Sequence, residues 1–142
     1  MPFKITTWNV NGLRAVLNKG ALAPVLDTQP DVLMLQEIKA RPDQILPALQ
    51  PIWPRAAEHW HPAERPGYSG VATFLQSSPR EVRTGLGLPN FDCEGRAILA
   101  HFPDFTLVNA YFPSGQRDAG RVNYKLEFYA ALLEICDRLQ PD

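Results

Sequence analysis

Four polar residues stand where three apolar, strand-like stretches of the sequence end. The stretch "TTWNVNGLRA" (6–15) places Asn9 and Asn11 on either side of a valine, and "DVLMLQE" (31–37) ends in Glu37. Tyr111 lies near the end of "FTLVNAYF" (105–112). Ligands of open α/β sheets gather at the carboxyl ends of the strands. The sequence therefore predicts that these residues meet in one polar site.

A divalent cation is the chemistry that this set of residues favours. A carboxylate such as Glu37, at the end of a buried strand, is costly to bury without a partner. Mg²⁺ is a suitable partner because it takes few protein oxygens and keeps several waters. Amide oxygens of Asn9 or Asn11 would then orient those waters or the carboxylate itself.

Each of these residues also has an ordinary structural interpretation. Glu37 could be a solvated strand end or an ion-pair partner of Lys39, and an asparagine at a strand-to-helix junction is often a turn or N-cap residue. Tyr111 shares its strand face with Phe105, Leu107 and Asn109, where a tyrosine is usually part of the core. Only the coincidence of several polar strand ends favours a functional site.

The elements that would position the site alternate between strands and helices. Strands are predicted over 3–9, 31–37, 68–76, 95–102 and 105–112, and the last two form an antiparallel pair because "PD" (103–104) supplies the turn. A helical pattern follows Gly12 and runs to Val25, and the clearest helix covers 122–139. The apolar stripe predicted for that last helix consists of Leu126, Tyr129, Leu132, Leu133, Cys136 and Leu139. This alternation predicts a layered α/β protein.

Length and composition fit a single globular domain. The chain has 142 residues, of which 45% are hydrophobic and 20% charged, and its formal net charge is −1. The charge argues against a protein that holds nucleic acid by overall basicity, but a local basic face with a bound cation could serve. No apolar run approaches the roughly 20 residues that span a bilayer, so no membrane association is expected. Two cysteines and a start without a signal-peptide pattern favour the cytoplasm.

Five short blocks occur in order along nearly the whole chain. They are "WNVNGLRA" (8–15), "PDVLMLQEIK" (30–39), "GYSGVA" (67–72), "EGRAI" (94–98) and "VNAYFPSG" (108–115). Together they resemble the exonuclease III family of apurinic/apyrimidinic endonucleases, within the endonuclease/exonuclease/phosphatase superfamily. The resemblance implies a four-layer α/β sandwich of the DNase I-like type. It also implies Mg²⁺- or Mn²⁺-dependent hydrolysis of duplex DNA at abasic sites or 3′ ends, by a protein not expected to form oligomers.

The resemblance assigns roles to the matching positions. Glu37 is implied as a metal ligand with Asn9 beside it, and Tyr111 as the catalytic tyrosine near the scissile phosphate. The remaining positions are implied to hold the hydrogen-bond network or to contact the substrate backbone and phosphate. These positions are Asn11, Lys39, Tyr68, Arg96 and Ser114.

The chain departs from the family in one large respect. Family members are about twice as long, and their second half carries a Gly-Asp-x-Asn strand end, a further Asp and a Ser-Asp-His motif, none of which occurs here. His59, His61 and His101 are expected to be surface or satisfied structural residues and not replacements. Residues 1–142 are therefore expected to form the N-terminal half of a single domain. This half would have an exposed sheet edge, an exposed apolar face and little nuclease activity on its own.

Three other interpretations remain open at this point. The chain could belong to another phosphodiesterase of the same superfamily, although "NGLRA" and "NAYFPSG" argue against that. It could be a non-catalytic remnant that binds DNA or a protein partner, without dependence on a divalent metal. It could also be an α/β domain in which all five blocks are purely structural.

Overall fold

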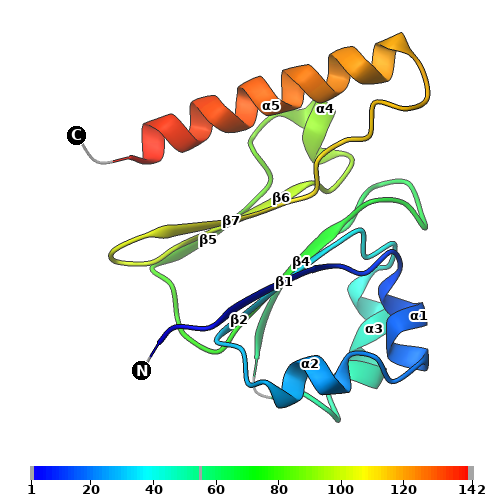
Figure 1. Ribbon diagram of the computed structural model, residues 1–142, viewed down its shortest axis with the longest axis vertical. Helices are drawn as coiled ribbons and strands as arrows, with labels where there is room; N and C mark the ends of the chain where they lie inside the picture. The colour runs from blue at the N-terminus through cyan, green and yellow to red at the C-terminus, as the bar shows by residue number, and fades with distance from the viewer. Residues whose placement is uncertain (1, 55, 141–142) are drawn as a thin grey trace.

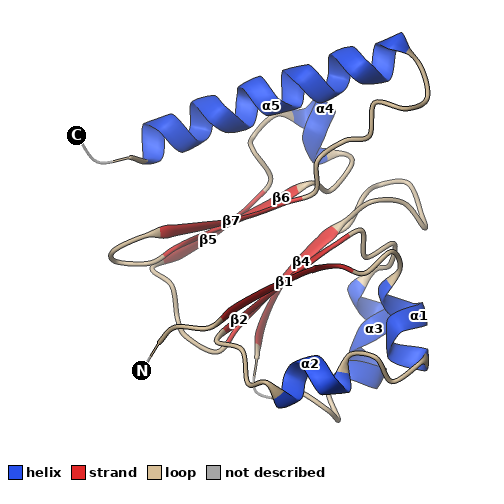
Figure 2. Ribbon diagram, in the orientation of Figure 1, coloured by secondary structure: helices blue, strands red, loops and turns tan. Residues whose placement is uncertain are grey.

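The computed structural model describes residues 2–54 and 56–140 and forms four layers. Three helices cover a four-stranded sheet, a three-stranded sheet packs on its other face, and a long helix covers the second sheet (Figure 1; Figure 2). The strands are β1 (Ile5–Asn9), β2 (Val32–Gln36), β3 (Ala57–His61), β4 (Val71–Leu75), β5 (Glu81–Thr84), β6 (Ala97–His101) and β7 (Thr106–Ala110). The helices are α1 (Leu13–Asn18), α2 (Ala23–Asp27), α3 (Pro42–Leu49), α4 (Pro89–Asp92) and α5 (Ala119–Leu139).

The first sheet has the order β1–β2–β4–β3, and the second has the order β5–β6–β7. β1 and β2 run parallel with Asn9 opposite Gln36, so their carboxyl ends lie side by side. β6 and β7 form the predicted antiparallel pair. β1 and β7 are outer strands, and both lie on the same side of the molecule (Figure 1).

The core follows the period-two alternation of the strands. In β2, Leu33 and Leu35 face the helices and belong to the main buried cluster, whereas Val32 packs between the two sheets with Leu75 and Ala100. The remaining buried members of the main cluster come mostly from α1, α3 and β4. β2 is thus covered on both faces, which explains its unbroken apolar run.

Several sequence-based predictions differ from the structure. The single helix expected after Gly12 is wrong. Gly20 adopts φ 68° after α1, and a separate helix, α2, begins at Ala23 with Pro24 in its first turn. The segment with His59 and His61, for which no strand is predicted, forms β3. Neither β5 nor α4 was predicted.

The buried stripe of α5 also differs from the prediction. Phe128, Leu132 and Ile135 are buried against the second sheet. Leu126 and Leu133, which were expected in that stripe, have exposed fractions of 58% and 63%. The helix is apolar on two faces, and periodicity alone does not show which face packs on the sheet. In the described part of the chain, no helix has both the length and the apolar character needed to cross a bilayer.

Candidate active site

The loops that follow β1 and β2 run side by side beyond the ends of the strands. Val10 N donates to Gln36 O at 3.0 Å, and Gly12 N donates to Glu37 O at 2.8 Å. Leu13 N then donates to Ile38 O at 2.9 Å at the start of α1. These bonds hold the two predicted polar segments, one with the asparagines and one with the glutamate, next to each other.

A third loop, at residues 69–70, fixes the other side of the Glu37 segment. Ile38 N donates to Gly70 O at 3.1 Å, and Lys39 N donates to Ser69 O at 2.9 Å. Five described non-glycine residues have positive φ, and four of them are in these three loops. Their φ values are 45° at Asn11, 56° at Glu37, 52° at Lys39 and 51° at Ser69. Asparagine tolerates this left-handed backbone, but it is unfavourable for Glu37, Lys39 and Ser69, and such strained residues cluster at functional sites.

The side chains of these loops form one polar cluster. Lys39 Nζ donates to Asn11 Oδ1 at 2.7 Å and lies 3.3 Å from Glu37 Oε1. Asn11 N donates to Asn9 Oδ1 at 3.1 Å. The structure therefore brings together Asn9, Asn11, Glu37 and Lys39. The ion pair between Glu37 and Lys39, one of the open alternatives, is present within this cluster.

Tyr111 approaches this cluster from the second sheet. It follows β7, and its N–H donates to Arg96 O at 2.8 Å, which continues the pairing with β6. Burial raises the pKa of Tyr111, and the negative charge of Glu37 raises this pKa further. The phenol is therefore close enough to the carboxylate to respond to its charge. It stays protonated at neutral pH and can act as a hydrogen-bond donor.

Arg96 lies behind Tyr111 and does not reach solvent. Its side chain is 2% exposed, and its Nη1 donates to Tyr111 O at 3.0 Å while its Nη2 donates to Tyr68 Oη at 3.1 Å. The guanidinium carbon lies 5.1 Å from the centre of the Tyr111 ring. Arg96 thus contacts both tyrosines of the site, and the substrate contact that the resemblance implies for Arg96 stays a prediction.

Glu94 and Arg121 complete the support of this cluster, and the sequence interpretation did not include them. Glu94 accepts a bond from Arg96 Nε at 2.8 Å and another from Arg121 Nη1 at 3.1 Å. Arg121 Nη2 also donates to Tyr68 Oη at 3.3 Å. Burial alone would raise the pKa of Glu94, but the bonds from both arginines lower it overall. The sequence "EGR" (94–96) places Glu94 two residues before Arg96, and this spacing was a signal for their ion pair. Arg121 lies 27 residues after Glu94, and no local sequence pattern identified it.

Gly95 is required by the close approach of this turn to the chain before it. Its φ is 58°, and a Cβ built on it would lie 2.3 Å from His61 O and 2.6 Å from Pro62 C. No larger side chain fits there without moving the backbone. The glycine therefore lets Glu94 and Arg96 reach the site from a turn packed against the end of β3.

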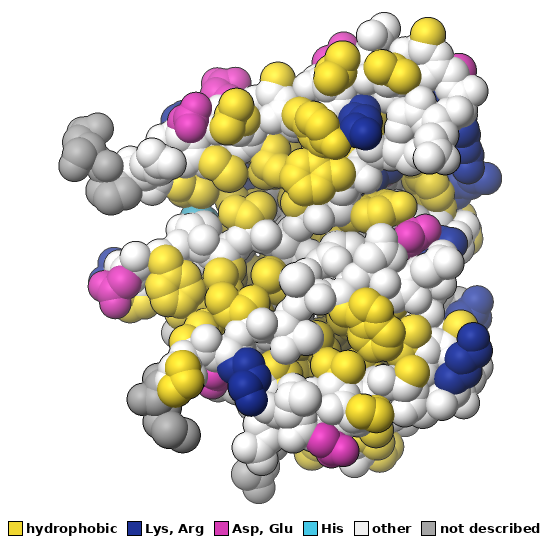
Figure 3. Space-filling model, viewed as in Figure 1, with side chains coloured by type: hydrophobic (Ala, Val, Ile, Leu, Met, Phe, Trp, Pro, Cys, Tyr) yellow, Lys and Arg dark blue, Asp and Glu magenta, His cyan; other side chains and the backbone are white. Residues whose placement is uncertain are grey.

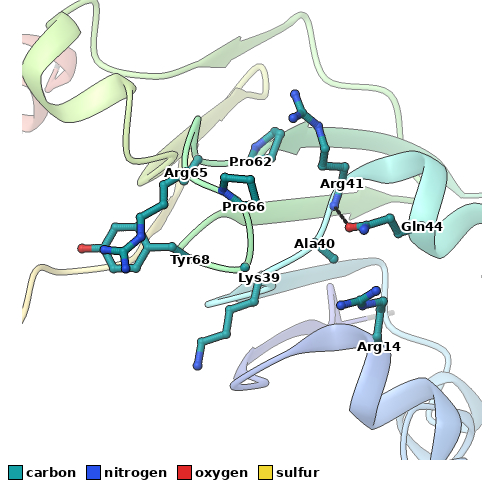
Figure 4. A pocket seen from close by; sticks show the side chains of 11 residues that line it. Arg14, Lys39, Ala40, Arg41, Gln44, Pro62, Arg65, Pro66 and Tyr68 are labelled. Carbon is teal, nitrogen blue, oxygen red and sulfur yellow. Dashed lines mark hydrogen bonds between the residues drawn. The ribbon is translucent and has the colours of Figure 1, made fainter.

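A groove of about 300 Å³ adjoins the polar cluster and is lined by positive charges (Figure 4). The cationic side chains along it are those of Arg14, Lys39, Arg41 and Arg65. Arg65 also stacks on the Tyr68 ring, with its guanidinium carbon 5.3 Å from the ring centre. Of these four cations, only Lys39 forms an ion pair among the described residues. The groove suits a polyanion, although the net charge of the chain is negative.

The remaining candidates lie outside this cluster. Ser114 is exposed in the loop after β7, where its hydroxyl accepts a bond from Gln116 N at 3.4 Å. His61 Nδ1 lies 3.1 Å from Ala97 O, and His101 Nδ1 lies 3.0 Å from Thr106 Oγ1. Both are satisfied histidines, as expected. His59 is half-buried in β3, and burial lowers its pKa.

The site offers carboxylate and amide oxygens, which are the ligand types that a hard cation such as Mg²⁺ prefers. Within residues 2–54 and 56–140, no three His, Cys, Asp or Glu side chains gather as a metal cluster. The donors that this chain offers are the Glu37 carboxylate, 21% exposed, and the amide oxygen of Asn9 beside it. Mg²⁺ accepts such a sparse set because waters complete its shell.

The sequence matches the model of the Endonuclease/Exonuclease/phosphatase family over residues 6–142, and the chain belongs to this family. DNA repair nuclease APEX1 from Danio rerio is 44% identical over 126 residues, which cover 86% of this chain and 40% of that protein. The Exodeoxyribonuclease of Bacillus subtilis is 36% identical over 131 residues, covering 92% of this chain and 50% of that protein. The chain thus spans half or less of the length of these curated relatives.

Solved structures agree with this assignment. A 3′ phosphatase from Neisseria, solved with its product DNA hairpin, superposes with a TM-score of 0.77 at 33% identity. That match covers 94% of this chain and 51% of the Neisseria chain. An AP endonuclease from Archaeoglobus fulgidus gives a TM-score of 0.81 at 26% identity and is covered over 53% of its length. The predicted family and the predicted DNase I-like α/β class are confirmed, and the relatives are DNA-repair nucleases.

Proposed function

We propose that this chain carries the first half of the active site of an exonuclease III-type nuclease that hydrolyses DNA phosphodiesters at abasic sites or 3′ ends. The supporting observation is the meeting of Glu37, its asparagine and lysine neighbours, and Tyr111 at the ends of β1, β2 and β7. Residues 1–142 would form the N-terminal half of a single domain. The cytoplasm remains the expected location, and no oligomer is expected of the completed protein.

Glu37, with Asn9 beside it, would hold Mg²⁺ or Mn²⁺. When bound, the ion would supply Lewis-acid stabilisation of negative charge on the phosphate oxygens. Lys39 Nζ lies 3.3 Å from Glu37 Oε1, so a bound metal ion would share the carboxylate with the lysine or replace it as the partner of this oxygen. Lys39 and Asn11 would keep the carboxylate oriented.

Two tyrosines would contact the phosphate as donors. Burial and the Glu37 charge keep the Tyr111 phenol protonated, so its O–H can donate to a phosphate oxygen. The Tyr68 oxygen accepts bonds from Arg96 and Arg121, which leaves its own proton for an acceptor outside the protein. Arg14 and Arg65 in the adjoining groove would bind the DNA backbone, and Ser114 would face the phosphate from the following loop.

The chain alone would have little or no nuclease activity. The Gly-Asp-x-Asn strand end, the further Asp and the Ser-Asp-His motif that the resemblance places in the second half of the family have no counterpart among the residues that form this site. β1 and β7 each have one backbone edge without a strand partner in the described structure. A second half-domain that paired with β1 and β7 would both extend the sheets and supply the missing groups.

Complementation in trans tests this proposal. The chain would be refolded with the half of the Bacillus subtilis Exodeoxyribonuclease that it does not match, and cleavage of abasic duplex DNA measured with Mg²⁺ or with a chelator. We expect metal-dependent cleavage only when both halves are present. Glu37→Gln and Tyr111→Phe should each lower the rate by about 100-fold or more. Glu58→Gln, the same change in β3, is the matched control and should retain the rate.

A DNA-binding role without catalysis is the second candidate, and the cationic groove favours it. It predicts DNA binding by the isolated chain that is unaffected by chelator or by Glu37→Gln. Binding of this kind, with no cleavage by the two halves together, would replace the nuclease proposal. Cleavage of lipid phosphates in place of abasic DNA would instead indicate another phosphodiesterase of the family.

A further inference from the structure

We propose that Asn109 is a positioning residue whose buried amide fixes Tyr111 relative to Glu37 across the two sheets. The inference depends on the proposed function only in treating these two residues as partners in the reaction. The geometric claim concerns the chain itself. It can be tested without DNA, metal or a second half-domain.

Asn109 is a buried polar residue that joins the inner faces of the two sheets. It lies in β7 with an exposed fraction of 1%. Its Nδ2 carries two N–H donors and lies 2.9 Å from Ala72 O, 3.1 Å from Thr73 Oγ1 and 3.3 Å from Leu35 O. Its Oδ1 accepts a bond from Gln36 Nε2 at 2.8 Å. One amide from the second sheet thus binds two neighbouring strands of the first sheet, β2 and β4.

These bonds lie directly beneath the candidate site. Asn109 is two residues before Tyr111 on the same face of its strand, and Gln36 immediately precedes Glu37. Gln36 Nε2 also lies 2.9 Å from Thr7 Oγ1, which extends the connection to β1. Hydrogen bonds through Gln36 therefore connect β1, β2 and β7, the three strands that end at the site. Each bonded residue lies one or two positions before the polar residue at the end of its strand.

A hydrogen-bonded amide can set this alignment in a way that apolar contacts do not. Apolar side chains between sheets tolerate small sliding movements, because their attraction is not directional. A buried amide that loses its partners is strongly unfavourable, so a shift of β7 across β2 would be penalised. Leu107, two residues earlier on the same face, packs in the same interface through apolar contacts alone. It provides a matched comparison for Asn109.

The test uses the electrostatic coupling between Tyr111 and Glu37 as its readout. The chain would be labelled with 3-fluorotyrosine at its four tyrosines, and the Tyr111 resonance assigned from Tyr111→Phe. The fluorine shift change caused by Glu37→Gln would be measured at a pH where the phenol is protonated. It would be measured in four backgrounds: wild type, Asn109→Leu, Thr73→Val and Leu107→Ala. Thermal unfolding would be recorded for each.

We expect a clear shift change in the wild type and an at least about threefold smaller one in Asn109→Leu. Leu107→Ala should lower the melting temperature but keep the full shift change, because a purely structural loss leaves the pair in place. Thr73→Val removes one hydrogen bond with little change in shape, and it gives an intermediate value even if Asn109→Leu does not fold. A full shift change in Asn109→Leu or Thr73→Val, or none in the wild type, would overturn the inference. Failure of trans complementation alone would not affect it.

Discussion

Two regions of the molecule differ in how completely they are covered. On the outer face of the first sheet, α1, α2 and α3 pack over β2 and β4, and side chains such as Leu33 and Ile45 have no exposed surface. On the side of β1 and β7, hydrophobic side chains remain at the surface, as Figure 3 shows for the face seen in Figure 1. The exposed ones along this side include Phe3, Ile5 and Phe112.

The exposed stripe of α5 continues this open side. Val122, Leu126, Tyr129 and Leu133 follow one another at helical spacing and are 40–63% exposed. Scattered exposed apolar residues are normal in soluble proteins, but a continuous set beside two unpaired strand edges indicates an interaction surface. The closed side therefore stabilises this chain, whereas the open side is suited to further polypeptide. The candidate site lies at the strand ends between them.

Among truncations of apolar side chains, the largest expected effect is on the closed side. Leu33→Ala should lower the free energy of unfolding by about 3 kcal/mol, because it leaves a cavity in a core without exposed surface. Ile5→Ala in the neighbouring strand is the open-side counterpart, since Ile5 is 43% exposed and lies opposite Val32. It should cost less than about 1 kcal/mol. Urea unfolding measures both, and equal losses would contradict the distinction between the two sides.

The next effect concerns the partly buried charges that join the second sheet to α5. Glu94→Gln should lower the free energy of unfolding by about 2 kcal/mol, because the buried Arg96 loses its charged partner. The loss is smaller than for a fully buried ion pair, since Glu94 is 18% exposed. The folded pKa of Glu94 lies below its ordinary value of 4.5, so its contribution is present above that value and lost as the pH falls through the folded pKa.

The pH dependence supplies the control for this prediction. Urea unfolding of the wild type should show stability falling on acidification below the ordinary pKa, and Glu94→Gln should weaken that fall. Glu81→Gln, an exposed change in β5, should leave the acid limb unchanged. If both variants keep the same acid limb, the Glu94 carboxylate is not held by its arginines in solution.

The strands of the molecule were unequally predictable from the sequence. β1, β2, β4, β6 and β7 could be predicted, because alternating or continuous apolar runs mark them. β3 was missed because "AEHWH" combines polar and aromatic residues and follows a proline-rich stretch, which resembles a loop. β5, a strand of four residues with three exposed, gave no periodic pattern.

At the site, spacing and the motif blocks identified the residues at strand ends, but not those that support them. The grouping of Asn9, Glu37 and Tyr111 could be predicted, since each ends a strand. Asn109 and Arg121 could not be assigned, because their role depends on how the second sheet and α5 pack on the rest of the chain. The burial of Arg96 was unpredictable for the same reason, as a lone arginine is usually exposed.

The smallest effect on stability is expected on α5. Leu133→Lys should change the free energy of unfolding by less than about 0.5 kcal/mol, because Leu133 is 63% exposed. It should nevertheless reduce concentration-dependent self-association in analytical ultracentrifugation and weaken binding of a complementary half-domain. Leu132→Lys places the same charge one residue earlier, where the side chain is 7% exposed against the second sheet, and should prevent stable folding. If Leu133→Lys instead unfolded the chain while Leu132→Lys did not, the face of α5 with Leu133 would be the packed one. The assignment of that face to the open side would then be wrong.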